Sequence, residues 1–394
     1  MDVSSLVKSL RKEIGCESFL TSKYTEVSHF IDTGSYALNR IMSGDMIHGG
    51  IPAGKVVVLA GEKSTGKSLI SAQIAVNALN KNKYDLVVMF DSEGGILKQF
   101  FKSQGADMSK IEYVLVSTIE ECSTKMQQFF DSVEPFKKAH PKFKCLVIMD
   151  SLGAMVGKKT REDAINKGKQ TGDQGLRAKS MNTFVKALTV PALKTDIPVV
   201  LLNHVYCDPN SMYPSKIKSQ SGGEGIQYMG SITIQCARTL VKTKGKEKGG
   251  DDDDDTEDII PEADATNDES FYKGSWLSFF TVKNRIVKPF YDAKVYVDFS
   301  KGLAKYEGLF DLAVKYGCIT VPSKGWYEVP SYKPGEKMRR SEISKPEIWE
   351  SFIKDLNEKA RKDICYCEGE SPDDEQYKIP GVDEDGPKEE AKTE

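Results

Sequence analysis

Several features that mark other classes of protein are missing from this chain. No apolar run approaches the ~20 residues of a membrane-spanning helix, so we expect no membrane contact. The start of the chain has no apolar stretch followed by a small-residue cleavage site, so we do not expect secretion. The eight cysteines are scattered, and Cys365 and Cys367 have no second Cys or His pair to complete a zinc site. Free thiols in a reducing cytoplasm are the expectation.

Acidic charge is concentrated in two segments. Residues 247–270 contain twelve Asp or Glu and one Lys, and residues 368–394 contain eleven acidic residues and three Lys. The whole chain has a net charge of −3, so the remainder has a net charge of +16. A basic body with two acidic segments indicates a polyanionic partner and segments that compete with it. A role in solubility alone is the alternative.

Short apolar stretches alternate with helical patterns through the first half of the chain. Strands are expected at 55–60, 86–90, 113–116, 146–149 and 199–202, and helices at 68–80 and 175–193. Wholly apolar short strands between helices are typical of a parallel sheet covered on both faces. Consecutive strands follow after residue 231. The predicted fold class is α/β, with a mostly parallel central sheet flanked by helices.

Four parts are expected along the chain. Residues 1–28 form an arm with an amphipathic helix, residues 29–307 the core, and residues 308–365 a small helical C-terminal domain. Residues 366–394 form an acidic tail, and residues 245–270 an acidic insertion in the core. Both acidic segments lack periodicity, so we expect disorder there. The helix of the arm is too short to be stable alone, which predicts that it packs on another surface.

One motif indicates a specific chemistry. Residues 61–68 fit the phosphate-binding pattern G-x-x-x-x-G-K-[ST], directly after a strand and at the start of a helix. In such a loop, backbone N–H groups and the helix N-terminus surround the phosphates of ATP. The predicted site comprises Gly61, Glu62, Lys63, Ser64, Thr65, Gly66, Lys67 and Ser68, with Lys67 on the β- and γ-phosphates and Ser68 on Mg²⁺. An ordinary glycine-rich turn is the alternative.

Three further strands end in polar residues at the same sheet edge. Asp150 is a candidate to hold Mg²⁺ through water, with a helix N-cap as the alternative. Glu93 is a candidate to orient the attacking water, with a capping role as the alternative. His204 is a candidate to sense the γ-phosphate, although a lone histidine is more often structural.

The ordered set of motifs resembles the RecA recombinase family, and closely its phage UvsX-type members, from about Ile31 to Trp326. IDTGSYALNRIMSG is similar to the start of the family's core, GEKSTGKS to its P-loop, and FDSEGG to the strand with its catalytic glutamate. CLVIMDSLGAM is similar to its Walker B strand and LLNHVY to the strand with its γ-phosphate sensor. TVKNRIVKPF resembles a strand whose basic residues reach the neighbouring subunit's ATP, and YEGLFDLAVKYGCI and KGWYEV resemble the start of the C-terminal domain.

The resemblance implies a RecA-type P-loop ATPase core with an N-terminal oligomerisation helix. It also implies catalytic roles for Lys67, Glu93 and His204, a place for Phe100 against adenine, and metal support by Asp150. Lys283 and Arg285 match two cations that act on the neighbouring subunit's ATP, so the site would be complete only in a filament. His204 departs from the Gln common in bacterial members, which leaves its protonation state open. A phage origin would place the protein in the host cytoplasm.

Two Gly- and Lys-rich segments, residues 157–175 and 205–225, match the family's DNA-binding loops. Cations neutralise phosphates, aromatic rings lie against bases, and glycines let the backbone approach closely. The predicted DNA-binding residues are Lys158, Lys159, Arg161, Lys167, Lys169, Arg177, Lys179, Lys186, Tyr206, Tyr213, Lys216, Lys218, Gly222 and Gly223. Glu162 and Asp163 weaken a purely electrostatic interpretation of the first loop. For Arg177, Lys179 and Lys186, a solvated helix surface is the alternative.

Together these observations predict an ATP-dependent recombinase that forms a filament on single-stranded DNA and catalyses homologous pairing and strand exchange. The expected cofactors are ATP and Mg²⁺. The expected partners are single-stranded DNA, homologous duplex DNA, further copies of the chain, and mediator and single-strand-binding proteins. A RecA-fold helicase or a recombination-mediator ATPase is the alternative enzyme class. A DNA-binding scaffold that uses ATP only structurally is the non-enzymatic alternative.

Overall fold

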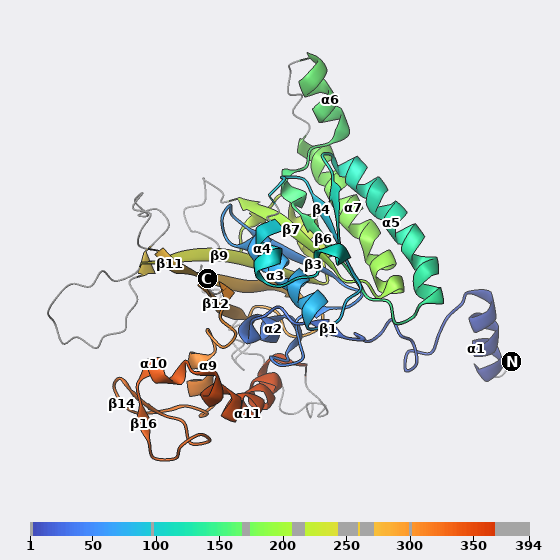
Figure 1. Ribbon diagram of the computed structural model, residues 1–394. Helices are drawn as coiled ribbons and strands as arrows, with labels where there is room; N and C mark the ends of the chain where they lie inside the picture. Colours follow the sequence, from blue (N-terminus) through green and yellow to red (C-terminus); the bar gives the residue numbers. More distant parts are fainter. Residues whose placement is uncertain are drawn as a thin grey trace, which may run out of the picture.

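A computed structural model describes residues 3–95, 98–167, 174–206, 217–242, 259–260, 272–298 and 302–366. An α/β core occupies the middle of the molecule, a small C-terminal unit lies below it, and helix α1 (Val3–Glu13) stands to one side (Figure 1). In the part of the chain that the structure describes, no helix has the length and apolarity to span a bilayer.

The core is built on an eleven-stranded sheet with the main order β13-β12-β11-β9-β3-β7-β6-β4-β5. The strands from β9 to β5 run parallel, and those from β9 to β13 are antiparallel. The bounds are β3 (Val56–Gly61), β4 (Leu86–Asp91), β5 (Ile111–Leu115), β6 (Cys145–Asp150), β7 (Val199–Tyr206), β9 (Ile232–Lys242), β11 (Tyr272–Asn284), β12 (Asp292–Asp298) and β13 (Gly302–Leu303). Two short strands, β8 (Ser219–Gln220) and β10 (Ile259–Ile260), pair with β7 and β9. The mostly parallel sheet confirms the predicted fold class.

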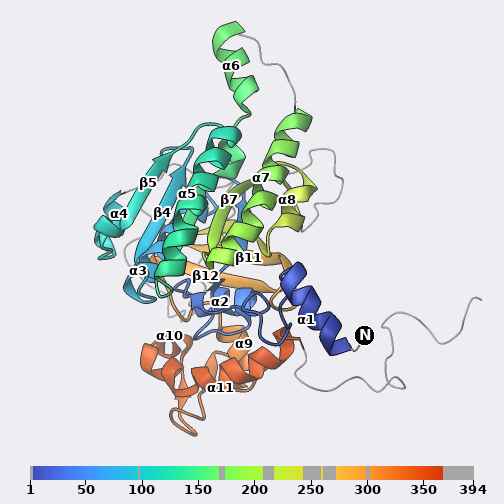
Figure 2. The same ribbon diagram turned by 90° about the vertical axis from the view of Figure 1, so that its right-hand side faces the viewer.

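Both faces of the sheet are covered by helices, and its central strands carry apolar side chains toward both faces over most of their length. Side chains alternate along β3, so that Val57 and Leu59 join one hydrophobic cluster while Val56 and Val58 join the other. The first cluster lies under α2 (Tyr36–Ser43), α3 (Lys67–Asn80) and α4 (Lys98–Ser103), and the second under α5 (Ile119–Ala139), α7 (Gln174–Thr195) and α8 (Glu224–Met229). Figures 1 and 2 show α5 and α7 side by side on their face of the sheet.

Several short elements connect these layers. They are the paired strands β1 (Phe30–Ile31) and β2 (Ile51–Pro52), and the 3₁₀ turns η1 (Met108–Lys110) and η2 (Leu152–Ala154). Helix α6 (Lys158–Lys167) projects from the body at the top of Figure 1.

The C-terminal unit differs from its helical prediction. Besides α9 (Phe310–Lys315), α10 (Arg340–Ile343) and α11 (Pro346–Ile364), it contains an antiparallel sheet of β14 (Thr320–Ser323), β15 (Trp326–Glu328) and β16 (Lys337–Met338). These strands have two to four residues, too few for an alternating pattern to appear in the sequence. Asn357 of α11 accepts a hydrogen bond from the Met46 amide at 2.7 Å, and buried Trp349 stacks on Tyr306, so the unit is tied to the core.

The N-terminal helix occupies the first half of the arm predicted for residues 1–28. It ends at Glu13, and Gly15 follows with φ 66°, a conformation that favours glycine and ends helices. No residue of α1 is buried, and Leu6 and Val7 expose their apolar side chains.

The acidic insertion departs from its expected disorder at one point. Ile259 and Ile260 pair with Val241 and Leu240 as β10. The rest of residues 245–270, and the tail from residue 367, lie outside the described residues.

Candidate active site and nucleic-acid interface

Four predicted parts of the site meet because parallel strands end at one edge of the sheet. In the register of β3 and β7, Gly61 lies opposite His204. In the register of β4 and β6, Asp91 lies opposite Asp150. The P-loop, the two acids after β4 and β6, and the histidine of β7 therefore form one site, at the end of a parallel sheet where ligands usually bind.

The P-loop joins β3 to α3 as predicted. Gly66 has φ 79°, and a Cβ atom there would lie 2.7 Å from Leu277 Cδ1, so both backbone and space call for glycine. Lys67 is buried, and its Nζ donates to the carbonyls of Gly61 at 2.9 Å and Glu62 at 2.6 Å. Burial lowers the pKa of Lys67, while the negative charges of Asp150 and Glu93 oppose this shift. Here Lys67 is bound to the carbonyls of its own loop.

Asp150 has the surroundings of a metal-supporting carboxylate. It is buried at the end of β6, and burial raises its pKa, while a hydrogen bond from the Ser68 hydroxyl opposes that rise. It does not cap a helix, because the residue before η2 is Ser151. A hydroxyl and one carboxylate fit Mg²⁺, which is usually bound by one or two carboxylates together with substrate phosphates and water.

Glu93, Ser151 and His204 form a triangle beside the P-loop. Glu93 Oε1 accepts a short hydrogen bond from the Ser151 hydroxyl, and His204 Nε2 lies 3.1 Å from both Glu93 Oε1 and Ser151 Oγ. Burial opposes the ionisation of Glu93, but these hydrogen bonds and the charges of His204 and Lys67 bring its pKa below the usual value. Glu93 is therefore held as a carboxylate.

The capping role considered for Glu93 belongs to Asp91. Its Oδ1 accepts the backbone N–H groups of Glu93 and Gly94, each at 2.8 Å, and its Oδ2 accepts the Tyr113 hydroxyl at 3.0 Å. Asp91 thus fixes the turn that presents Glu93. The sequence did not predict that Asp91 holds the turn or that Ser151 binds Glu93. Asp91 lies two residues before Glu93, and Ser151 directly follows Asp150.

A glycine allows His204 to sit close to η2. A Cβ atom on Gly153 would lie 2.4 Å from His204 Cδ2 and 2.9 Å from His204 N. The turn itself is held by Arg177, whose guanidinium donates to the Gly153 carbonyl at 2.6 Å and the Met155 carbonyl at 2.9 Å. Arg177 was predicted to bind DNA, but in this structure it supports the turn under His204.

Phe100 lines a cavity of about 130 Å³ between α3 and α4. The cavity also contacts Ser68, Met89 and Asp150. The structure therefore brings Phe100 next to the phosphate end of the site, and its ring meets Phe101 edge to face.

Lys283 and Arg285 lie at the opposite end of the sheet from the P-loop. Gly61 pairs with Cys236, which pairs with Phe279, whereas Lys283 pairs with Thr233 four residues further along β11. That separation is about 13 Å at the rise of an antiparallel strand. Lys283 Nζ donates to the Tyr228 carbonyl, and burial together with the charge of Arg285 lowers the pKa of Lys283 to about 8.

The second predicted DNA loop starts at the γ-phosphate candidate and returns beside it. β8 pairs with the end of β7, and the Ser221 amide donates to the His204 carbonyl at 2.8 Å. Tyr206 is exposed, and Lys218 forms an ion pair with Glu62 of the P-loop at 2.5 Å. Gly222 and Gly223 both have positive φ, and only Gly223 has open space at its Cβ position. Tyr213 and Lys216 lie outside the described residues.

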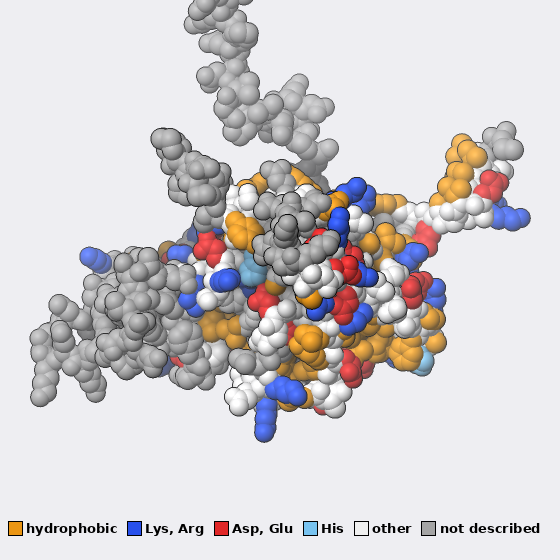
Figure 3. Space-filling model, turned by 90° about the horizontal axis from the view of Figure 1, so that it is seen from above, with side chains coloured by type: hydrophobic (Ala, Val, Ile, Leu, Met, Phe, Trp, Pro, Cys, Tyr) orange, Lys and Arg blue, Asp and Glu red, His pale blue; other side chains and the backbone are white. Residues whose placement is uncertain are grey.

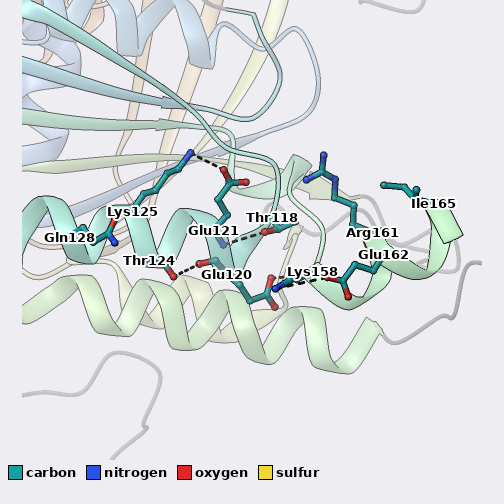
Figure 4. A pocket seen from close by; sticks show the side chains of 10 residues that line it. All are labelled: Thr118, Glu120, Glu121, Thr124, Lys125, Gln128, Lys158, Arg161, Glu162 and Ile165. Carbon is teal, nitrogen blue, oxygen red and sulfur yellow. Dashed lines mark hydrogen bonds and ion pairs between the residues drawn. The ribbon is translucent and has the colours of Figure 1, made fainter.

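The first predicted DNA loop is partly a helix, which corrects the prediction. Residues 158–167 form α6, whose root packs against the start of α5 around a pocket of about 560 Å³ (Figure 4). Arg161 donates to Ser117 Oγ at 2.5 Å, and Lys158 Nζ lies 3.9 Å from Glu162. The side chain of Lys167 and all of Lys169 lie outside the described residues.

Four of the lysines predicted to bind DNA are exposed. They are Lys158, Lys159, Lys179 and Lys186. Seen from above, the described side chains on this end of the molecule mix basic, acidic and apolar types (Figure 3). This mixture agrees with the weakened electrostatic interpretation of the first loop.

Comparison with known proteins decides among the classes of P-loop protein. The family model described as the RecA N-terminal domain matches residues 2–254, well over half of the chain. The chain belongs to the RecA family. It is 26% identical over 340 residues to the recombination and repair protein of Enterobacteria phage T4, covering 85% of this chain and 76% of that protein. It is 24% identical over 334 residues to protein RecA of Nitratiruptor, covering 84% of each.

A further RecA protein, from Thermotoga maritima, is 24% identical over 328 residues, covering 82% of this chain and 78% of that protein. As a RecA-family member, the protein is a recombinase and DNA-dependent ATPase that acts in recombination and repair. Membership implies nucleotide binding, DNA binding and filament formation. The predicted family and function are confirmed, while the roles of individual residues stay predictions.

Proposed function

We propose that this RecA-family recombinase binds ATP with Mg²⁺ at the P-loop. Lys67 leaves the carbonyls of Gly61 and Glu62 and binds the β- and γ-phosphates, because phosphate oxygens are stronger acceptors for a buried ammonium. The Ser68 hydroxyl and the Asp150 carboxylate would hold Mg²⁺, which would neutralise charge on the phosphates. The ring of Phe100, beside Ser68 and Asp150, lies against the nucleotide.

Hydrolysis uses the triangle of Glu93, Ser151 and His204. The Glu93 carboxylate orients a water molecule and takes its proton as the water oxygen bonds to the γ-phosphorus. The bond between the γ-phosphorus and the β-phosphate oxygen breaks, which gives ADP and inorganic phosphate. The His204 ring donates a hydrogen bond to the γ-phosphate. The backbone carbonyl of His204 accepts a hydrogen bond from the Ser221 amide, so a movement of His204 after phosphate release also moves the second DNA loop.

The active site is completed by a second copy of the chain. Lys283 and Arg285 cannot reach the P-loop of their own subunit, since they lie at the far end of the sheet. We assign them to the γ-phosphate of the neighbouring subunit, where two cations stabilise the charge that develops in phosphoryl transfer. The N-terminal arm, residues 1–28, supplies a second contact between subunits through the exposed apolar face of α1.

The DNA partners follow from this arrangement. Single-stranded DNA binds along the segments 157–175 and 205–225, and homologous duplex DNA is compared with it by base pairing. Mediator and single-strand-binding proteins are proposed partners, and the cytoplasm is the proposed compartment. The proposed acidic tail, from Glu368, competes with DNA for the basic body.

The contact of Glu93 with Ser151 and His204, beside Lys67, is the observation that carries this proposal. Steady-state ATP hydrolysis with and without single-stranded DNA tests it. We expect DNA to stimulate hydrolysis strongly in the natural protein, and Lys67→Ala to abolish both rates. Hydrolysis that ignores DNA at low salt would contradict the proposal.

A further inference from the structure

We propose that Lys218 is a positioning residue that couples DNA binding to the P-loop by exchanging partners, Glu62 without DNA and a DNA phosphate with it. The inference rests on the proposed function of the site. In this proposal, the ion pair between Lys218 and Glu62 makes ATP binding depend on whether the second DNA loop holds DNA.

The backbone of Lys218 is fixed to the strand beside the P-loop. Gln235 accepts the Lys218 amide hydrogen bond at 3.0 Å and donates to the Lys218 carbonyl at 2.7 Å. Gln235 is itself buried, and it pairs with Ala60, the residue before the P-loop. The side chain of Lys218 therefore starts from a defined position and reaches Glu62 at 2.5 Å.

The same glutamate holds the ATP-binding lysine through its backbone. The Glu62 carbonyl accepts hydrogen bonds from Lys67 Nζ at 2.6 Å and from Thr65 Oγ1 at 2.9 Å. Lys67 must leave this carbonyl to bind phosphates. An ion pair that anchors the Glu62 side chain stabilises the arrangement in which Lys67 is withheld, and it thereby weakens nucleotide binding in the absence of DNA.

DNA can break this ion pair without great cost. The side chains of Lys218 and Glu62 are 37% and 42% exposed, so solvent screens their attraction. The phosphates of single-stranded DNA in the second loop offer Lys218 a competing anion. Once Lys218 turns to a phosphate, its ion pair with the Glu62 side chain is broken. Coupling between two ligands is reciprocal, so ATP strengthens DNA binding by the same factor as DNA strengthens ATP binding.

The test measures ATP affinity with and without a single-stranded oligonucleotide, using full-length protein. In Glu62→Gln and in Lys218→Gln, we expect ATP affinity without DNA to rise by about two- to fivefold, the range for a partly exposed ion pair. The double variant should equal either single variant. The matched control is the exposed ion pair of Glu134 and Lys138 on α5, at 2.8 Å; Glu134→Gln with Lys138→Gln should leave ATP affinity unchanged.

Exchanging the two charges separates this proposal from a general effect of substitution. With Glu62→Lys and Lys218→Glu together, the ion pair returns and ATP affinity without DNA falls back to its natural value. DNA no longer raises it, because a glutamate at 218 does not bind phosphate. If DNA raises the ATP affinity of these variants by the same factor as in the natural protein, and DNA still stimulates hydrolysis, this inference is wrong. Absence of DNA stimulation in the natural protein would instead overturn the proposed function.

Discussion

At the scale of single residues, the site depends on how one carboxylate is kept charged. Glu93 is partly buried, which disfavours its charged form, yet Ser151 and His204 both bind the same oxygen. A hydrogen bond to a charged group is worth about 1.5–3 kcal/mol, enough to offset partial burial. The Ser151 hydroxyl therefore lowers the pKa of Glu93, which is the proposed general base.

Removing this hydroxyl should make Glu93 easier to protonate. The pKa of Glu93 lies below its usual value, so its carboxylate is lost only when pH falls through that lowered value. Ser151→Ala raises the pKa, and the acid limb of the hydrolysis rate should move up by about one pH unit. Profiles of DNA-stimulated hydrolysis against pH measure this. Ser151→Thr keeps a hydroxyl, so the acid limb of its pH profile should match that of the natural protein. If the acid limbs of the Ala and Thr variants fall at the same pH, the assignment is wrong.

Lys283 should give an alkaline limb of its own. Its pKa is lowered to about 8 by burial and by Arg285, so its positive charge is lost as pH rises through that value. If that charge binds the neighbouring subunit's ATP, filament assembly with ATP should weaken above about pH 8. Lys283→Arg remains charged and should extend assembly by about one pH unit or more. Light scattering of filaments across this pH range measures it, and identical alkaline limbs would argue against the role.

At the scale of elements, the starts of the parallel strands were predictable and the connections were not. Four apolar runs located the starts of β3, β4, β6 and β7 within two residues. Their register, which places Gly61 opposite His204 and Asp91 opposite Asp150, follows from parallel pairing. Residues 158–167 were not predicted as a helix because they lie in the segment 157–175, whose Gly and Lys content suggested a loop. Helix α6 contains two apolar residues, Ala164 and Ile165, which are too few to show periodicity. Its root is held by polar bonds such as that from Arg161 to Ser117.

The part played by Arg177 could not be read from the sequence for a similar reason. Its spacing on α7 matches a basic helix face, and only the fold shows that its guanidinium turns to the carbonyls of Gly153 and Met155. Ser151 and Asp91 follow predicted strands, but their contacts depend on how those strands pair. Long-range hydrogen bonds of this kind leave no periodic signal.

The N-terminal helix should act between subunits rather than within one. Its apolar side chains are exposed, and Leu6 lies on the apolar face while Ser5 lies opposite. Burying a leucine stabilises a contact by about 1.5–3 kcal/mol, so Leu6→Asp should raise the protein concentration needed for assembly by about tenfold or more. Ser5→Asp adds the same charge and should have little effect. Sedimentation at several concentrations measures both variants, and equal behaviour would contradict an intersubunit role for α1.

At the scale of the whole molecule, the proposed residue roles give each subunit two halves of different active sites. The P-loop and Glu93 lie at one end of the sheet, and Lys283 and Arg285 at the other. A chain of subunits that each present both ends joins these halves at every interface. Nucleotide binding, assembly and the ordering of the DNA loops are then parts of one equilibrium, and the pair of Glu62 and Lys218 links its two ligands within a subunit.

Strand exchange between single-stranded DNA and duplexes of matching or unrelated sequence tests this account most directly. With ATP and Mg²⁺, we predict that the natural protein forms joint molecules only with the matching duplex, and that Lys67→Ala forms none. Joint molecules that form without ATP, or in Lys67→Ala, would contradict the account. So would a protein that hydrolyses ATP on DNA yet never pairs matching strands.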